Sequence, residues 1–295
     1  MRILVTGGSG LLGSTLVLEM KKRGHDVIAT FRSPADGRAY MDLSDINSIE
    51  RCIINSKPDC IVHTAAITNV DYCELHPEEA MRINGYATGA IAKYASRVGA
   101  HLVYISTDYV FSGAKGLYRE DDGTDPVNVY GKSKLLGEEE VRRNIHDFAI
   151  ARASVIFGPR PASGKENFAL WTINQLRQSR NVKVVFDQFV SPTLSSNLAE
   201  MLCEICERNL TGIFHLSGAT RIDRYSFAVR IAETFGLDKN LIQPVSSSEM
   251  SWVAKRPRDS SLDVSKASDV LKLKPLSLGE ALKRLYSELR TDSNA

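Results

Sequence analysis

The sequence predicts an α/β fold, in which a doubly wound parallel sheet is joined to a smaller, interleaved C-terminal lobe. Short apolar runs alternate with segments of helical spacing through the first half of the chain. Each run is continuously apolar, as strands of a parallel sheet buried on both faces are. The first run ends at a glycine-rich loop that opens a helix, and sheets of this kind bind ligands at the carboxyl ends of their strands.

The first half of the chain alternates predicted strands with predicted helices. The strands are apolar and rich in valine and isoleucine, and we place them at 2–6, 26–30, 60–66, 101–106 and 147–154. The helices repeat apolar residues at helical spacing, and we place them at 11–24, 45–56, 77–99 and from about 130 to 144. Asp45 or Ser44 is the expected N-cap of the second helix, and Pro77 opens the third.

The second half is less regular and is shared between two domains. We expect a sheet-covering helix at 195–208, a strand at 212–218, helices near 225–236 and at 278–290, and a loose end at 291–295. The predicted large domain comprises 1–157 and about 191–210. The predicted substrate-binding lobe comprises about 158–190 and 211–295.

The composition is that of an ordinary globular protein. Of 295 residues, 43% are hydrophobic and 24% are charged, and the formal net charge is only +2. This balance argues against a nucleic acid or a membrane surface as partner, because either would require a basic patch or stripe. The sequence has no recognisable signal peptide and no apolar run of membrane-spanning length, so the expected location is the cytoplasm.

The five cysteines are not expected to form a disulfide framework, because their number is odd and the chain is long. Cys203 and Cys206 have C-x-x-C spacing but lie inside a continuous amphipathic helix. A redox pair normally stands at a helix N-terminus, and a zinc site needs a second ligand pair. We therefore interpret both as buried apolar residues.

The loop VTGGSGLLG places glycines in G-x-x-G-x-x-G spacing, directly after a strand and at the start of a helix. Such glycines let the backbone approach a pyrophosphate, and the helix N-terminus supplies N–H donors and a positive dipole. A plain strand–helix turn is the alternative interpretation. The alternating units that follow favour a Rossmann dinucleotide site, formed by Gly7, Gly10, Leu11, Leu12 and Gly13.

The end of the second predicted strand indicates which dinucleotide binds. An acidic residue there would bond the ribose 2′-hydroxyl of NAD, but the chain has Arg32 and Ser33. A guanidinium and a hydroxyl suit a 2′-phosphate, so the preferred cofactor is NADP(H). The alternative is that Arg32 is an ordinary solvated loop residue.

Polar residues follow the fourth predicted strand. Thr107, Asp108 and Tyr109 should lie at its carboxyl end, over the cofactor crevice. Tyr130 and Lys134 stand one helical turn apart on the next helix. This pair is either a surface contact or a proton-transfer site in which the lysine lowers the pKa of the phenol. The convergence of a hydroxyl, a phenol and an ammonium favours proton transfer beside a hydride donor.

Several of these segments resemble those of a known family. GGSGLLG (7–13), STDYVF (106–111) and YGKSK (130–134) are similar to motifs of the extended short-chain dehydrogenase/reductase family. DQFVSPT (187–193) and RPRDSSLD (256–263) resemble segments of its dTDP-4-dehydrorhamnose reductases. The resemblance covers nearly the whole chain.

The resemblance implies roles for the polar residues at the crevice. Tyr130 would protonate the developing alkoxide of a reduced ketone. Lys134 would lower the pKa of the phenol and bond the nicotinamide ribose. Thr107 would hold the substrate carbonyl oxygen, with Asp108 and Tyr109 close to the sugar.

The resemblance also implies further contacts with the cofactor. Asp42 and Leu43 match an acidic–apolar pair that contacts adenine. Ala65 and Ala66 match small residues beside the ribose and phosphates of the cofactor, where bulkier side chains would exclude it.

On the substrate side, Arg256 is expected to bind the substrate, and Val155 occupies a position where some relatives have a tryptophan against the sugar. Val190 stands where glycine is usual. These two departures concern the identity of the sugar more than the chemistry. Since no cluster of metal ligands is legible, we predict no required metal.

Other side chains admit ordinary structural interpretations. His63 and His215 are interpreted as hydrogen-bonded structural residues. Trp171 and Trp252 either line the sugar pocket or belong to the core. The sequence leaves open which face of its helix Asn84 occupies.

Three functions are compatible with these observations. The first is NADPH-dependent reduction of a nucleotide-linked 4-keto-6-deoxy sugar, in dTDP-rhamnose synthesis, and a homodimer is compatible with it. The second is a regulatory role resembling the methionine adenosyltransferase β subunit, which would bind NADP(H) and a catalytic partner enzyme. The third is a sugar-nucleotide epimerase or dehydratase, which is disfavoured because a dehydratase should carry an acidic pair after Thr107.

Overall fold

The computed structural model describes residues 1–32, 39–160 and 166–292. Across these residues the large domain is built on a seven-stranded sheet in which every neighbouring pair runs parallel. In sheet order the strands are β11 (Gly212–His215), β6 (Phe148–Ala153), β5 (His101–Thr107), β4 (Cys60–His63), β1 (Arg2–Thr6), β2 (Asp26–Phe31) and β3 (Ala39–Tyr40). The order reverses between β1 and β4, which confirms the doubly wound sheet and places its ligand crevice at their carboxyl ends.

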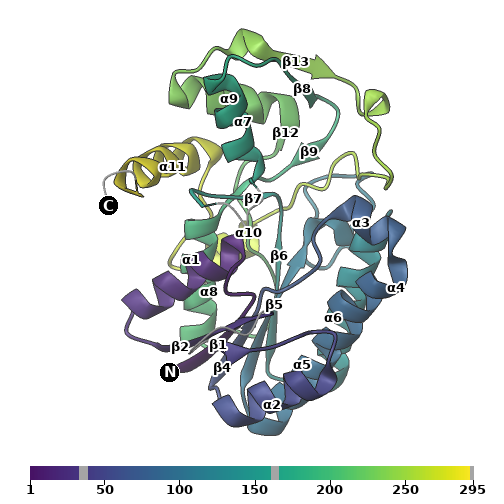
Figure 1. Cartoon of the computed structure of the whole chain (residues 1–295), viewed down its shortest axis with the longest axis vertical. Helices are drawn as coiled ribbons and strands as arrows, with labels where there is room; N and C mark the ends of the chain where they lie inside the picture. The colour runs from purple at the N-terminus through teal and green to yellow at the C-terminus, as the bar shows by residue number, and fades with distance from the viewer. Residues whose placement is uncertain (33–38, 161–165, 293–295) are drawn as a thin grey trace.

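Helices cover both faces of this sheet (Figure 1). One face is covered by α1 (Leu11–Lys22), α8 (Ser195–Glu207) and α10 (Ser265–Val270). The other face is covered by α2 (Ile46–Ser56), α5 (Ala87–Val98) and α6 (Val129–Asn144). Successive strand residues supply the two cores alternately, so Leu4 packs in one core and Val5 in the other.

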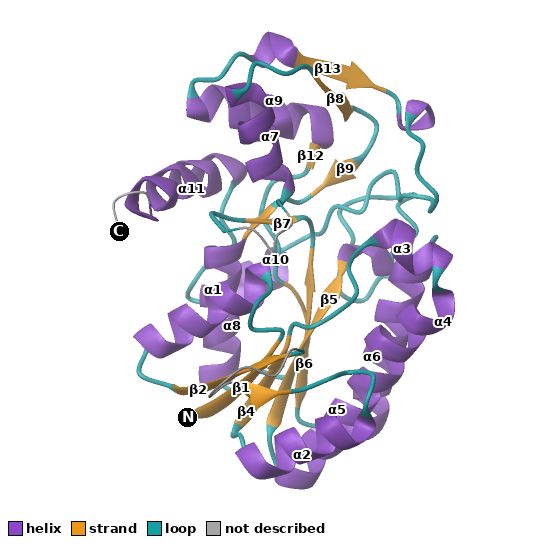
Figure 2. Cartoon of the chain, viewed as in Figure 1, coloured by secondary structure: helices purple, strands orange, loops and turns teal. Residues whose placement is uncertain are grey.

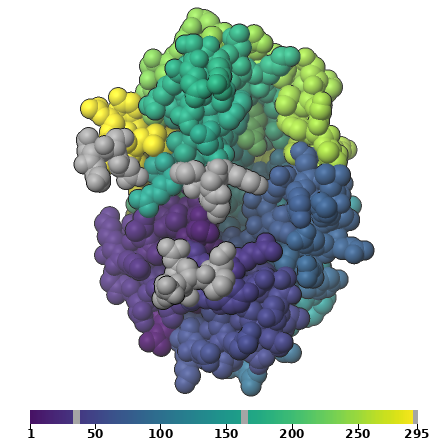
Figure 3. Space-filling view, in the orientation of Figure 1, coloured from purple at the N-terminus to yellow at the C-terminus, as the bar shows by residue number. Residues whose placement is uncertain are grey.

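The smaller lobe lies beyond the carboxyl ends of the strands (Figure 2), and in Figure 3 its teal and green surface is seated on the purple and blue large domain. Its helices are α7 (Phe168–Arg177), α9 (Arg224–Phe235) and α11 (Leu278–Asp292). Its short strands pair as β8 (Val182–Val185) with β13 (Ile242–Val245), β9 (Phe189–Val190) with β12 (Ile222–Asp223), and β7 (Ile156–Phe157) with β10 (Thr193–Leu194). The lobe has its own apolar cores, which include Phe157, Phe227 and Leu282.

The predicted domain boundary at 211 is wrong. Strand β11 was assigned to the lobe, but it pairs with β6 and forms the edge of the large sheet. Helix α10 also belongs to the large domain, because Ala267 and Leu271 pack in the same core as α1 and α8. The chain therefore crosses between the lobes more often than the sequence pattern indicates.

The predicted helix 77–99 is interrupted. In its place the structure has α4 (Pro77–Ala80), a π-helical turn (Met81–Tyr86) and α5 in succession, preceded by α3 (Val70–Leu75). The π turn carries Asn84, whose side chain accepts from the Ile67 backbone N–H at 2.8 Å and donates to the Ile67 carbonyl at 3.0 Å. These two bonds explain why the wider turn is favoured here, and π turns are frequent at functional sites.

Smaller predictions are confirmed. Asp45 caps α2 by accepting a hydrogen bond from the Asn47 backbone N–H at 2.9 Å. Cys203 and Cys206 are free and buried in α8, and burial raises the pKa of Cys203 to about 12. Among the described residues, the helices lack the combination of length and apolar character that crossing a membrane requires.

Close packing of α6 on β5 should make Gly137 difficult to replace. A Cβ at this position would overlap the Tyr104 hydroxyl and lie 2.6 Å from the Asn84 carbonyl oxygen. We expect Gly137→Ala to lower the free energy of unfolding by about 1–3 kcal/mol, as overpacking of a core does. The matched control is Gly279→Ala on exposed α11, where an added Cβ meets nothing within 4 Å. Urea denaturation measures both variants, and an equal effect of the two would contradict the packing argument.

Candidate active site

The glycine loop lies between the ends of β1 and β4. Gly7 has a φ of +70°, and a Cβ on it would lie 3.0 Å from the backbone of Ala65. A Cβ on Gly13 would overlap the Gly7 carbonyl oxygen. The side chains of Leu11 and Leu12 are buried, so it is the backbone N–H groups of the first helical turn that remain for a phosphate. The loop thus fits a pyrophosphate at the N-terminus of α1, which is capped by Gly10.

The end of β2 borders the same loop, because the Gly8 N–H donates to the Thr30 carbonyl at 3.0 Å. Arg32 follows this strand and is exposed, and its charge contributes to lowering the pKa of Asp42. The main cause of that lowering is a hydrogen bond from the Ser44 backbone N–H, at 2.8 Å. Arg32 is therefore an exposed cation at the carboxyl end of β2, and its contact with a 2′-phosphate stays a prediction. Ser33, predicted beside it, lies outside the described residues.

The predicted adenine contacts, Asp42 and Leu43, follow β3, which pairs with β2 at the edge of the sheet. The Asp42 carboxylate accepts from both the backbone N–H and the hydroxyl of Ser44, at 2.8 Å each, so it shapes the turn that leads to α2. Leu43 is partly buried against the core beneath that face of the sheet. Both residues follow the carboxyl end of β3, and their contact with adenine stays a prediction.

The loop after β4 forms the opposite wall of the dinucleotide crevice. Its backbone is bonded to Thr6 at the end of β1, since the Ala65 N–H donates to the Thr6 hydroxyl at 3.2 Å. Ala65 and Ala66 are partly exposed, as a wall facing a ligand would be. Further along, Asn84 holds the Ile67 backbone from the π turn. The small side chains predicted here therefore lie on a loop that is held from two sides.

Helix α6 places Tyr130 in its first turn. Asn128 caps the helix by accepting from the Gly131 N–H at 2.8 Å. A Cβ on Gly131 would overlap the Tyr109 carbonyl oxygen, which explains the glycine between the phenol and the ammonium. The Tyr130 and Tyr109 rings meet edge to face, with centroids 5.8 Å apart. Burial raises the pKa of Tyr130, and Thr107 opposes this shift.

Lys134 lies one turn further along the same face. Its side chain is 3% exposed, and its Nζ lies 4.2 Å from the centroid of the Tyr104 ring. Burial lowers the pKa of this lysine to about 7, and the charge of Glu138 opposes the shift. The prediction that Lys134 lowers the pKa of the phenol is wrong for this arrangement, because burial dominates both groups. The phenol remains protonated and able to donate near neutral pH.

Strand β5 delivers the remaining polar residues to this point. Thr107 ends the strand, and its hydroxyl donates to Asp108 at 2.9 Å and accepts from the Tyr109 N–H at 3.2 Å. The Asp108 carboxylate also accepts from the hydroxyls of Ser154 at 2.7 Å and Ser260 at 2.6 Å. Burial raises its pKa, and these hydroxyls oppose the shift. The family resemblance implies that Asp108 lies close to the sugar. In the structure its carboxylate is only 2% exposed and already accepts hydrogen bonds from three hydroxyls.

Tyr109 and the segment 187–193 are joined beside Tyr130. The Tyr109 hydroxyl accepts from the Gln188 side-chain amide at 3.3 Å. Burial raises the pKa of Tyr109, whereas the charges of Arg224 and Arg256 lower it. The late segments that the family resemblance singled out therefore do reach the end of β5.

Arg256 and Val155, both predicted to bind the substrate, have different neighbours. The Arg256 guanidinium pairs with Asp71 in α3 at 3.0 Å and stacks over Trp252, with 5.3 Å to the ring centroid. Val155 follows β6 with a φ of 41°, which is unusual for a β-branched residue, and packs against the lobe core. Strained backbone of this kind is concentrated at functional sites, which supports a role for the end of β6.

Sequence patterns do not predict Tyr104 or Glu138 as residues of the site, and they leave open the face that Asn84 occupies. In sequence, Tyr104 looks like an ordinary core residue of a strand. In the structure, the Lys134 Nζ lies over the face of its ring. Asn84 lies in a π turn that periodicity cannot reveal. Glu138 follows Lys134 by one more helical turn, and this spacing alone could have identified it. His63 is structural as predicted: it bonds the Thr6 and Thr88 hydroxyls, and burial lowers its pKa to about 3.

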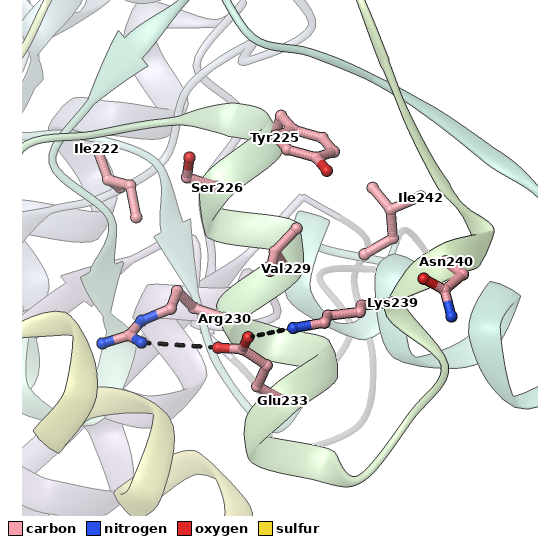
Figure 4. Close-up of a pocket in the computed structure, with 9 residues that line it drawn as sticks. All are labelled: Ile222, Tyr225, Ser226, Val229, Arg230, Glu233, Lys239, Asn240 and Ile242. Carbon is pink, nitrogen blue, oxygen red and sulfur yellow. Dashed lines mark hydrogen bonds and ion pairs between the residues drawn. The ribbon is translucent and has the colours of Figure 1, made fainter.

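A separate pocket of about 550 Å³ lies in the lobe, on the face of α9 that meets β13 (Figure 4). Glu233 in its wall pairs with Lys239 at 3.0 Å and with Arg230 at 3.6 Å. Its lining comes from the segments 222–233 and 239–242, which hold none of the predicted site residues. We therefore place the chemistry at the crevice of the sheet and not in this pocket.

The chain is similar to known proteins along nearly its whole length. A family model described as RmlD substrate binding domain matches residues 1–291. The chain is 36% identical over 289 residues to the spore coat polysaccharide biosynthesis protein SpsK of Bacillus subtilis, covering 97% of each. It is 34% identical over 273 residues to methionine adenosyltransferase 2 subunit beta of Bos taurus, covering 90% of this chain and 81% of that protein. The crystal structure of dTDP-4-dehydrorhamnose reductase from Bacillus anthracis in complex with NADP matches with a TM-score of 0.90 and 30% identity, covering 97% of this chain and 99% of that one.

Replacing Lys134 with methionine should change how stability depends on pH. The pKa of this lysine falls from 10.5 to about 7 on folding, so between these values the unfolded chain binds one more proton than the folded chain. The wild type should therefore gain stability relative to Lys134→Met as the pH rises through this window, by up to roughly 4 kcal/mol. Urea unfolding of both proteins at several pH values within the window measures the difference, and a difference that is independent of pH would refute the assignment.

Proposed function

Because the chain belongs to the RmlD substrate-binding-domain family of extended short-chain dehydrogenases/reductases, which includes sugar-nucleotide reductases, we propose that it reduces the 4-keto group of a nucleotide-linked 6-deoxy sugar with NADPH. The substrate that we propose is dTDP-4-dehydrorhamnose. The observation that supports this proposal is that Tyr130 and Lys134 lie one turn apart on α6, and that Tyr130 interacts with Thr107 at the carboxyl end of β5.

The cofactor assignment rests on the fit of two separate regions. The glycine loop can fold this tightly, against the Ala65 backbone and on itself, only because Gly7 and Gly13 lack side chains, and this turn brings the N-terminus of α1 to the crevice for a pyrophosphate. Arg32 at the end of β2 supplies a cation for a 2′-phosphate, which NADPH has and NADH lacks. NADPH, when bound, supplies the hydride that reduces the keto carbon.

The residues of the chain supply the proton and orient the substrate. Tyr130 holds its proton firmly because burial raises its pKa, so it is a donor and not a base at neutral pH. As negative charge develops on the carbonyl oxygen, the phenol donates its proton to that oxygen and the product is an alcohol. Lys134, one helical turn along the same face of α6, would bond the nicotinamide ribose through its Nζ.

A second function deserves a direct comparison because its sequence support is similar. Identity to methionine adenosyltransferase 2 subunit beta is 34%, against 36% for SpsK. In this alternative the chain would bind NADP(H) and a catalytic partner enzyme, and would not turn over a sugar. The complete set of Thr107, Tyr130 and Lys134 favours the enzyme.

Mixing the protein with NADPH and dTDP-4-dehydrorhamnose should cause the nicotinamide absorbance to fall. Tyr130→Phe should reduce kcat by about 10²- to 10⁴-fold, the usual contribution of a positioned proton donor, while NADPH affinity changes little. Fluorescence titration of NADPH provides the control for binding. If the wild type binds NADPH tightly and leaves it unoxidised, the regulatory function becomes the better explanation.

Arg32→Ala should weaken the binding of NADPH far more than that of NADH. Loss of a charge-assisted hydrogen bond to the 2′-phosphate corresponds to about a tenfold to hundredfold increase in Kd. The matched control is Arg97→Ala, since Arg97 is exposed on α5 and pairs with Glu50 at 3.1 Å. Calorimetric titration with each dinucleotide measures the effect, and equal weakening of both would exclude the assignment of the 2′-phosphate to Arg32.

A further inference from the structure

The Asp108 carboxylate is the meeting point of three segments that are distant in sequence. Its Oδ1 accepts from Thr107 at the end of β5, and its Oδ2 accepts from Ser154 at the end of β6 and from Ser260 in the segment 256–263. The carboxylate is 2% exposed and both serines are fully buried. Burial raises the pKa of this carboxyl, and the three hydroxyl donors oppose that shift, since each of them stabilises the ionised form.

The number of hydrogen atoms that these groups can donate has a consequence for catalysis. A hydroxyl has one hydrogen, and an ionised carboxylate can only accept. While Thr107 donates to Asp108 and accepts from the Tyr109 N–H, it has only its remaining lone pair to offer to Tyr130, and this suits a protonated phenol. After Tyr130 gives up its proton, the phenolate needs a donor, and the Thr107 hydrogen can turn toward it only if Asp108 remains satisfied. Ser154 and Ser260 supply the two bonds that keep it so.

Ser260 connects the reorientation of the Thr107 hydroxyl to the segment 256–263, which contains the predicted substrate-binding residue Arg256. The Ser260 N–H donates to the Phe189 carbonyl at 3.1 Å, and the Phe189 N–H donates to the Arg258 carbonyl at 2.7 Å. The same segment carries Arg256, which pairs with Asp71 of α3. A change in the position of this segment would therefore reach Thr107 through a single side chain.

We propose that Asp108 is a positioning residue, which sets the direction of the Thr107 hydroxyl hydrogen during proton transfer, and that Ser260 couples the segment 256–263 to this step. The proposal rests on the reductase function proposed above. In this proposal Asp108 acts through Thr107, and it does not contact the sugar as the family resemblance implies. Asp108 donates nothing and is not consumed, because only the single hydrogen of Thr107 changes its acceptor.

Ser260→Ala tests the proposal, with Ser261→Ala as its matched control. Ser261 is equally buried and in the same segment, but its hydroxyl donates to Asp259 at 2.6 Å and accepts from the Leu117 N–H at 2.8 Å. We expect Ser260→Ala to lower kcat about tenfold, with KM and NADPH affinity unchanged, and Ser261→Ala to leave kcat within about twofold. Asp108→Asn, which keeps the shape and removes the charge, should lower kcat further.

Three results would overturn the proposal. A rise in KM at constant kcat for Asp108→Asn would mean that Asp108 contacts the sugar directly. An equal loss of kcat in Ser261→Ala would mean that the segment matters only for packing, and thermal unfolding of each variant measures that effect separately. Thr107 Oγ1 should keep its distance of 2.9 Å from Asp108 in a crystal structure of Ser260→Ala, because the carboxylate then depends on this bond; a Thr107 hydroxyl that has moved out of hydrogen-bond distance would show that Ser260 does not act through Asp108. This last measurement needs no turnover, so it remains decisive even if the wild type fails to oxidise NADPH with the proposed sugar.

Discussion

Helix α6 lies closer to strand β5 than two ordinary side chains would allow, and the geometry of the crevice depends on this close approach. A side chain on Gly131 would overlap the Tyr109 carbonyl, and one on Gly137 would overlap the Tyr104 hydroxyl. Glycines six positions apart therefore let the helix lie against the strand along nearly two turns. The tyrosine and the lysine between and beside them are carried to the end of β5 as a consequence. Without this approach the hydroxyl of Thr107 and the phenol would belong to separate surfaces.

The same close packing buries charge and so determines how the site is balanced. Glu138 is fully buried and accepts two hydrogen bonds from Arg152, at 2.9 and 2.7 Å, and one from Ser106 at 2.6 Å. Its carboxylate is thus largely committed to a guanidinium and only partly offsets the charge of Lys134. His63 stays neutral, because burial and the nearby lysine both lower its pKa. The site therefore contains one cation that is readily lost near neutral pH, above a tyrosine ring that favours its charged form.

Patterns that repeat along the chain predicted most of the fold, and local chemistry predicted the composition of the crevice. Apolar runs and helical spacing located the sheet and its covering helices, and the spacing of Tyr130 and Lys134 indicated that they share a face. The π turn at Asn84 was invisible because one extra residue barely changes an apolar pattern. The boundary near 211 was misplaced because a strand that joins a sheet edge looks the same in sequence as one that joins a small lobe. The pKa of Tyr130 was predicted in the wrong direction because residue type reveals a neighbouring charge, whereas only the structure reveals how far water is excluded.

The path of the chain through the two lobes has a consequence for biosynthesis. The edge strand of the large sheet, β11, begins at residue 212, and α10, which covers it, begins at residue 265. While the chain is still emerging from the ribosome, β6 must present an open row of N–H and C=O groups until the lobe in between has been made. An exposed strand edge is a template for incorrect pairing. We therefore expect the nascent protein to depend on chaperones after β6 has been synthesised and before β11 is available to pair with it.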